Sequence, residues 1–229
     1  MTQLRESGGG KPAIDKAMAR ALTYRLARPP GQSYEYVNAN YLILGAVIEQ
    51  VSGKPYETYC RQAVLRPLGA AGNLGAKWAA LSAYGGWSLT AADYLKFLHA
   101  FDRASGIADA ATWRWMLTPG GKSLGKGPNA HYALGVVVRR EPGGPAFLHT
   151  GLWTHAQADA AGGPLADSHA TLAVKSPTGL SWFVYMAPQP PNAARFALDR
   201  ALWHVHDSVR RPAVAQAPSA RAAASARRD

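Results

Sequence analysis

Residues 30–56 read PGQSYEYVNANYLILGAVIEQVSGKPY, and this stretch decides how the rest of the chain is interpreted. It begins with a Pro-Gly turn and a polar loop that runs as far as Asn38. A nearly continuous apolar run follows at 40–51, and the tetrapeptide at 52–55 ends it with a glycine and then a proline. Because a helix that is apolar all round is normally buried, we expect 40–51 to form a buried helix directly after the loop.

Outward from this stretch, the apolar spacing changes from helical to strand-like along the chain. Helices are expected at 14–26, 56–65, 91–101, 110–117 and 193–206. Strands are expected at 132–139, 146–150, 170–175 and 180–186, with 176–179 as the hairpin loop between the last two. Helices followed by an antiparallel sheet and a closing helix predict an α+β architecture. The mainly helical part would cover about 12–128, and the sheet with its closing helix about 129–207.

Tyr36 and Asn38 form a Tyr-x-Asn motif, with Tyr41 three residues further on and the apolar helix directly after it. The segments RPLG at 66–69 and GGWSLTAAD at 85–93 follow in order. Together these features resemble the serine β-lactamase-like superfamily, which includes class C β-lactamases, DD-peptidases and family VIII esterases. The resemblance covers residues 30 to about 187. It implies a β-lactamase/transpeptidase-like fold, with a helical subdomain and an antiparallel sheet flanked by a C-terminal helix.

The same resemblance implies a third motif at His149-Thr150-Gly151, at the end of a predicted strand. In such enzymes a serine attacks a carbonyl carbon, and water cleaves the resulting acyl-enzyme. Tyr36 would then shuttle protons, and Asn38 would hold a substrate amide or a catalytic lysine. Thr150 and Gly151 would belong to the substrate-binding strand, with Thr150 lining the cleft. The backbone N–H of Leu152 would form half of an oxyanion hole.

His149 stands where many relatives have a lysine, and this difference bears on the substrate. A histidine side chain ordinarily carries little positive charge at pH 7, so it binds a substrate carboxylate more weakly than lysine does. The ligand is therefore expected to be a small ester or amide rather than a β-lactam, although a β-lactam-like ligand remains in the predicted class. The alternative interpretation of His149 is a histidine at a strand end whose ring is hydrogen-bonded to the backbone.

The nucleophile motif of the family, Ser-x-x-Lys, has no match in residues 1–35. Its one literal match is Ser123-Leu124-Gly125-Lys126, which lies after Tyr36 in a loop rich in glycine and lysine and is expected by chance. Residues 1–9 resemble the segment between the first and second motifs, so we expect an N-terminally incomplete domain. Without a neighbouring cation Tyr36 would be a poor base. A missing strand would also expose a sheet edge through which the chain self-associates.

The net charge of +11 raises the question of nucleic-acid binding. The segment 208–229 carries four of these charges, and its Ala, Pro, Ser and Arg composition predicts a disordered basic tail. The tail contains no aromatic residues among its arginines, so no specific nucleic-acid site is expected. The sequence shows no apolar run long enough to span a membrane and no signal peptide at its start, and it leaves the localisation unknown.

The single cysteine, Cys60, excludes an internal disulfide and is expected to be a buried, unreactive thiol. His155 and His169, with Asp159 or Asp167, fit no metal-ligand spacing, so neither a metal nor a cofactor is predicted.

Three hypotheses follow from the sequence. The chain belongs to a serine hydrolase whose nucleophile lies in another segment, it is a non-catalytic binding relative, or it is a basic nucleic-acid binder. The first accounts for the most motifs and the third rests on charge alone.

Overall fold

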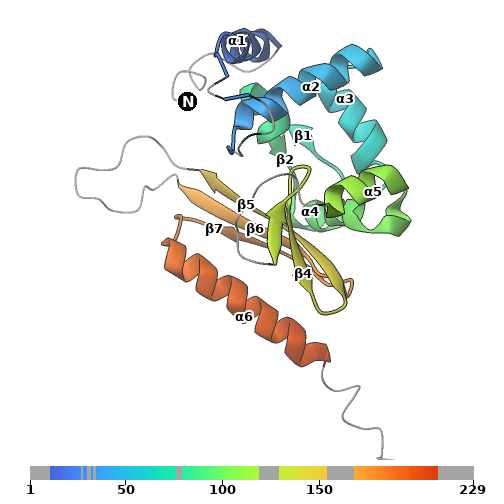
Figure 1. The fold of residues 1–229 in the computed structure, drawn as a ribbon, viewed down its shortest axis with the longest axis vertical. Coiled ribbons are helices and arrows are strands. Elements are labelled where there is room, and N and C mark those ends of the chain that lie inside the picture. The colour runs from blue at the N-terminus through green and yellow to red at the C-terminus, as the bar shows by residue number, and fades with distance from the viewer. Residues whose placement is uncertain are drawn as a thin grey trace, which may run out of the picture.

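The computed structural model describes residues 11–26, 28, 29, 32, 35–75, 79–118, 129–153 and 168–210. A helical part comes first, and a sheet with a closing helix follows, as predicted (Figure 1). The helices are α1 (Lys11–Leu22), α2 (Asn38–Ser52), α3 (Tyr56–Cys60), α4 (Ala91–Leu98), α5 (Ala110–Leu117) and α6 (Asn192–Arg210). The short elements between them are η2 (Arg61–Leu65), β1 (Asn73–Leu74), η3 (Ala79–Tyr84), β2 (Trp87–Ser88), η4 (His99–Phe101) and η5 (Arg103–Ser105).

The main sheet is an antiparallel meander in the order β3-β4-β5-β6-β7. Its strands are β3 (Ala130–Tyr132), β4 (Val137–Glu141), β5 (Gly144–Trp153), β6 (His169–Lys175) and β7 (Ser181–Met186). His149 pairs with Ala173 across β5 and β6. Within the described part of the chain, β7 pairs with β6 alone, so one edge of β7 is left without a described partner. The exposed sheet edge and self-association through it both stay predictions.

The two faces of the sheet bury different aromatic side chains, because successive residues of a strand point to opposite faces. On one face Phe147 stacks on Phe101 with ring centroids 5.2 Å apart, and Trp113 of α5 meets Phe147 edge-on. On the other face Trp182 of β7 meets Trp203 of α6 at 5.0 Å. Helices of the first part and α6 therefore cover opposite faces, as Figure 1 shows.

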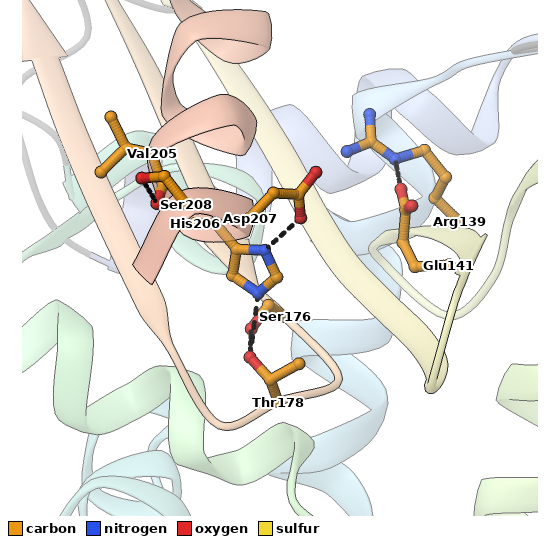
Figure 2. A network of polar contacts seen from close by, with 8 residues as sticks. All are labelled: Arg139, Glu141, Ser176, Thr178, Val205, His206, Asp207 and Ser208. Atoms are coloured by element: carbon orange, nitrogen blue, oxygen red, sulfur yellow. Dashed lines mark hydrogen bonds and ion pairs between the residues drawn. The ribbon is translucent and has the colours of Figure 1, made fainter. Parts of the chain in front are cut away.

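A series of hydrogen-bonded side chains links the end of α6 to the turn between β6 and β7 (Figure 2). The buried ring of His206 lies 2.9 Å from the Thr178 hydroxyl through Nε2 and 3.0 Å from the Asp207 carboxylate through Nδ1. The Thr178 hydroxyl in turn lies 2.9 Å from the hydroxyl of Ser176. Because the buried side chains of His206 and Ser176 each have a polar partner, α6 docks on the turn without leaving these two groups unsatisfied.

The single strand predicted at 132–139 is wrong, because the chain forms a tight turn in its middle. β3 ends at Tyr132 and β4 begins at Val137, and the Ala133 N–H donates to the Val136 carbonyl at 2.8 Å. Gly135 adopts φ +80°, a left-handed conformation that glycine reaches without a steric penalty. The apolar pattern across this segment hid the turn, and the glycine was the available signal for it.

The helix predicted at 40–51 exists as α2, but the expectation that all its faces are buried is wrong. Within it only Leu42 and Gly45 are buried. Leu44, Val47 and Val51 are 51%, 48% and 83% exposed and lie along one side of the helix. The described residues thus cover α2 on one side, which the all-round apolar pattern did not predict.

The end of α6 also differs from the prediction. The helix continues to Arg210, so the first three residues of the segment predicted as a tail, 208–229, are helical. Residues 211–229 lie outside the described residues. Among the described helices, none combines the length and apolar content that crossing a bilayer requires.

Candidate functional site

A cavity of about 460 Å³ lies between the helical part and the sheet. Tyr36 and Asn38 line it at the start of α2, and His149 lines it from the middle of β5. The structure therefore brings together all three residues that the sequence predicted to be catalytic, from positions more than a hundred residues apart. The volume of the cavity is within the range of small-molecule sites, roughly 300–1,000 Å³.

The local backbone explains the Tyr-x-Asn spacing. Val37 is extended (φ −132°, ψ 113°), and α2 begins at the next residue, Asn38. Side chains on either side of one extended residue point the same way, so Tyr36 and Asn38 can both face the cavity. The other end of α2 is fixed by Gly53 at φ +66°, whose N–H donates to the Glu49 carbonyl at 2.9 Å.

Tyr36 lies at the mouth of the cavity, half exposed, with its ring centroid 6.0 Å from that of Tyr132. Burial, and secondly the nearby Tyr132, raise the pKa of the Tyr36 phenol above its ordinary value. The group is therefore a neutral hydrogen-bond donor at neutral pH and a poor base.

A second tyrosine of the motif, Tyr41 of α2, packs its side chain against the turn between β3 and β4. A Cβ atom on Gly135 would lie 3.3 Å from the Tyr41 phenol oxygen, so the glycine allows the turn to approach closely. Burial raises the pKa of Tyr41, as does Tyr36, while a hydrogen bond from the Gly135 backbone lowers it in part. Tyr41 therefore joins α2 to the sheet at the cavity wall and keeps its proton at neutral pH.

Gly151 and its neighbours do not line the cavity with their side chains. Alternation along β5 places Thr150 and Leu152 on the face opposite to His149. The Gly151 N–H donates to Thr171 Oγ1 at 3.0 Å, and a Cβ on Gly151 would lie only 2.5 Å from that oxygen. Position 151 thus needs a glycine because any larger side chain would collide with Thr171 on β6. The substrate-binding role of 150–152 stays a prediction.

Aromatic side chains form a row along another part of the wall, and sequence analysis did not assign them to the site. Tyr94 and Phe97 meet edge-on at 5.7 Å, and Phe97 meets Phe101 edge-on at 6.1 Å. Phe101 continues this row to Phe147 on the sheet. The helical spacing of the α4 residues was visible in the sequence, but it indicated only a buried face and not which cavity that face borders.

The formal charge of the cavity wall is unusual for so basic a chain. Among the described residues that line it, Glu35 carries the one carboxylate, and none is lysine or arginine. None of these lining residues has an aliphatic hydroxyl or a thiol either. The described wall offers phenols, amides and one imidazole, which can donate and accept hydrogen bonds but supply no acyl-transfer nucleophile of the serine type.

Cys60 lies outside this wall and is half-buried rather than fully buried. Burial raises the pKa of its thiol, although a hydrogen bond with Tyr56 opposes this shift. A protonated thiol is a weak nucleophile, which is consistent with the predicted unreactive cysteine.

Several residues weighed in the sequence fall elsewhere. The Ser123-Lys126 match and His155, Asp159 and Asp167 lie outside the described residues. His169 is described, and its ring stacks on that of Trp153 with centroids 6.3 Å apart.

Comparison with known proteins agrees with the fold. The family described as Beta-lactamase matches residues 2–206. The chain therefore belongs to the Beta-lactamase family, and its α+β fold is the β-lactamase/transpeptidase-like fold that the motifs implied. A comparison with the curated proteins finds no match.

Solved structures show the same fold at low identity. D-amino acid amidase from Ochrobactrum anthropi SV3 in complex with L-phenylalanine amide matches with a TM-score of 0.63 and 16% identity, over 90% of this chain and 66% of that one. Its complex with L-phenylalanine matches at 0.65 and 15%, over 90% and 66%. SurE with D-Leu matches at 0.58 and 22%, over 79% and 45%. The chain thus spans about half to two thirds of the length of these structures.

Proposed function

We propose that the cavity is the substrate site of a hydrolase that cleaves a small ester, amide or β-lactam through an acyl-serine. The observation that carries this proposal is the convergence of Tyr36, Asn38 and His149 on one cavity. Membership of the Beta-lactamase family supports hydrolysis as the reaction class. The amidase among the similar structures supports amides within the substrate class.

Each of the three residues has a chemically suitable role. With its raised pKa the Tyr36 phenol donates a hydrogen bond or a proton to the leaving group. The Asn38 amide, which both donates and accepts, holds the amide or ester group of the substrate. His149 faces the same space from β5 and fixes the acyl portion by a hydrogen bond.

The backbone of β5 is the proposed source of an oxyanion donor. The Gly151 N–H points toward β6, where it meets Thr171, and backbone N–H groups alternate in direction along a strand. The Leu152 N–H is therefore directed to the other edge of β5. The pairing of β4 with β5 ends at Leu148, so that N–H is available for a developing oxyanion.

The serine nucleophile is proposed to come from a segment outside the described residues. No described lining residue carries an aliphatic hydroxyl, and an acyl-enzyme requires one or a thiol. Because the Ser-x-x-Lys motif also has no match in residues 1–35, we expect residues 1–229 by themselves to bind substrate but not to form an acyl-enzyme. A second candidate function is a non-catalytic binding protein of the same fold, which the lack of a described lining aliphatic hydroxyl also favours. The two candidates differ in one outcome: an added nucleophile segment should create hydrolase activity in the first and not in the second.

The experiment compares the chain with an extended polypeptide that carries the Ser-x-x-Lys segment of a family member before residue 1. Both are treated with a fluorophosphonate probe and assayed with p-nitrophenyl acetate. We expect labelling and hydrolysis only in the extended polypeptide, and about 10²- to 10⁴-fold lower kcat/KM for its Tyr36→Phe variant.

Tyr59→Phe is the matched control, because Tyr59 lies on α3 and does not line the cavity. Labelling of a serine in the 229-residue chain would overturn the proposed origin of the nucleophile. An extended polypeptide that folds and binds ligand, yet is neither labelled nor active, would favour the non-catalytic binding protein.

A further inference from the structure

The cavity has an apolar floor and a polar mouth. Leu98 and Phe147 on its wall are each 4% exposed, whereas Tyr36 is 54% exposed and Glu35 beside it is also exposed. A ligand that enters this space thus meets aromatic and aliphatic side chains at depth and a carboxylate at the entrance. Such a gradient favours an amphipathic ligand whose ring enters first.

The charge of the wall restricts the polar end of that ligand. Glu35 is the one carboxylate among the described lining residues, and no described lysine or arginine compensates it at the wall. Within the described part of the chain Glu35 has no ion-pair or hydrogen-bond partner. A ligand carboxylate would face like charge with no cation to pair with, whereas an ammonium would find a free carboxylate.

The tyrosines at the mouth add to this preference. Tyr36 and Tyr132 lie with ring centroids 6.0 Å apart, and both phenols have a pKa raised by burial, so both stay neutral at neutral pH. Faces of neutral aromatic rings attract cations through their quadrupole. The carboxylate and the two rings therefore act on the same kind of charge.

We infer that the cavity selects ligands that combine an aromatic ring with an ammonium group, and that Glu35 is the residue that binds the ammonium. This inference rests on the proposed function only in taking the cavity as the substrate site. It narrows the substrate class to aromatic esters or amides that carry a free amine, and it disfavours β-lactam-like ligands that carry a carboxylate.

The test uses three ligands of similar shape that contain no ester or amide bond, namely 2-phenylethylamine, 2-phenylethanol and 3-phenylpropanoate. Their dissociation constants for the full chain are measured by NMR titration at pH 7 and low ionic strength. We expect the amine to bind about 5- to 10-fold more tightly than the alcohol, from an ion pair and cation–π attraction together, and the acid to bind most weakly. Added salt should reduce the preference for the amine.

Two variants assign the preference to one residue. Glu35→Gln should bind the amine and the alcohol within about twofold of each other, with the alcohol affinity unchanged. Glu35→Asp keeps the charge and should keep the preference. Because Glu35 is exposed, neither substitution should affect folding, which circular dichroism checks.

The outcomes separate this inference from the proposed function, since none of the three ligands can be hydrolysed. Equal binding of all three, tighter binding of the acid, or no binding at all would overturn the inference. A charge preference that survives in Glu35→Gln would overturn the assignment to Glu35. If the chain prefers the amine but its extended form is neither labelled nor active, the proposed hydrolase function is wrong and the inference about Glu35 stands.

Discussion

Replacing Gly151 by alanine should destabilise the strand that carries His149, and the structure gives the size of the effect. The new Cβ would lie 2.5 Å from Thr171 Oγ1, roughly 0.9 Å inside the 3.4 Å at which ordinary contact begins. Thr171 can relieve the overlap by rotating its side chain, but it then loses the hydrogen bond from the Gly151 N–H. We expect a loss of about 2–3 kcal/mol in the free energy of unfolding, from strain and the lost hydrogen bond.

The assay is thermal and urea unfolding followed by circular dichroism, where this loss corresponds to a fall in Tm of about 4–12 °C for a chain of this size. Thr171→Ala removes the obstructing oxygen, so Gly151→Ala should cost much less in that background, with a coupling energy of about 1–2 kcal/mol. Thr171→Val puts a methyl group where the oxygen was and should give no rescue. Additive effects of the Gly151 and Thr171→Ala substitutions would refute the reasoning.

Three further predictions concern residues that shape or support the fold. Ser82 is buried at φ +42° and ψ −121°, so Ser82→Gly should raise Tm by about 2–4 °C while Ser82→Ala should not, as differential scanning calorimetry would show. Hydrogen bonds from Thr90, Lys96 and the Ala71 backbone lower the pKa of Asp93 to about 2. The stability that the ionised Asp93 contributes is therefore present above pH 4 and is lost as the pH falls toward 2. Asp93→Asn should flatten the dependence of the urea midpoint on pH in that window. The buried Lys175 ammonium pairs with Asp102 at 3.0 Å. In chemical denaturation, Asp102→Asn should lower the free energy of unfolding by about 1.5–3 kcal/mol, and Lys175→Met should lower it clearly less, because the methionine leaves no buried charge. Equal losses for the two variants would contradict this.

The sequence was sufficient for elements whose boundaries have strong local causes. The α5 helix was predicted near 110–117, where the structure has it, and Asp109 caps it by accepting from the Thr112 N–H at 2.7 Å. The hairpin at 176–179 and the helix begun after Thr90 have similar local signals. The apolar run through Gly135 misled because periodicity does not register a turn whose flanking residues are all apolar.

The site was predictable only where a motif carried it. Tyr36, Asn38 and His149 were predicted from the resemblance of their motifs, in the order in which they occur, to the serine β-lactamase-like superfamily, and they line one cavity. The aromatic residues of α4 that line the cavity could not be predicted as site residues, because their helical spacing is the same whether α4 faces solid core or a cavity. Glu35 lies next to Tyr36, yet an exposed carboxylate in a loop has no signal until the charges around it are known.

The charges at the cavity also bear on what an added nucleophile segment must supply. The described wall contains no lysine, no arginine and no aliphatic hydroxyl, and the raised pKa of Tyr36 keeps its phenol protonated. A serine added alone would find only the His149 imidazole and the Glu35 carboxylate as bases on the described wall, whereas a lysine placed beside Tyr36 would favour the phenolate and lower that pKa. A segment with serine and lysine one helical turn apart would therefore provide the two groups that are lacking, and a serine without the lysine should be labelled poorly.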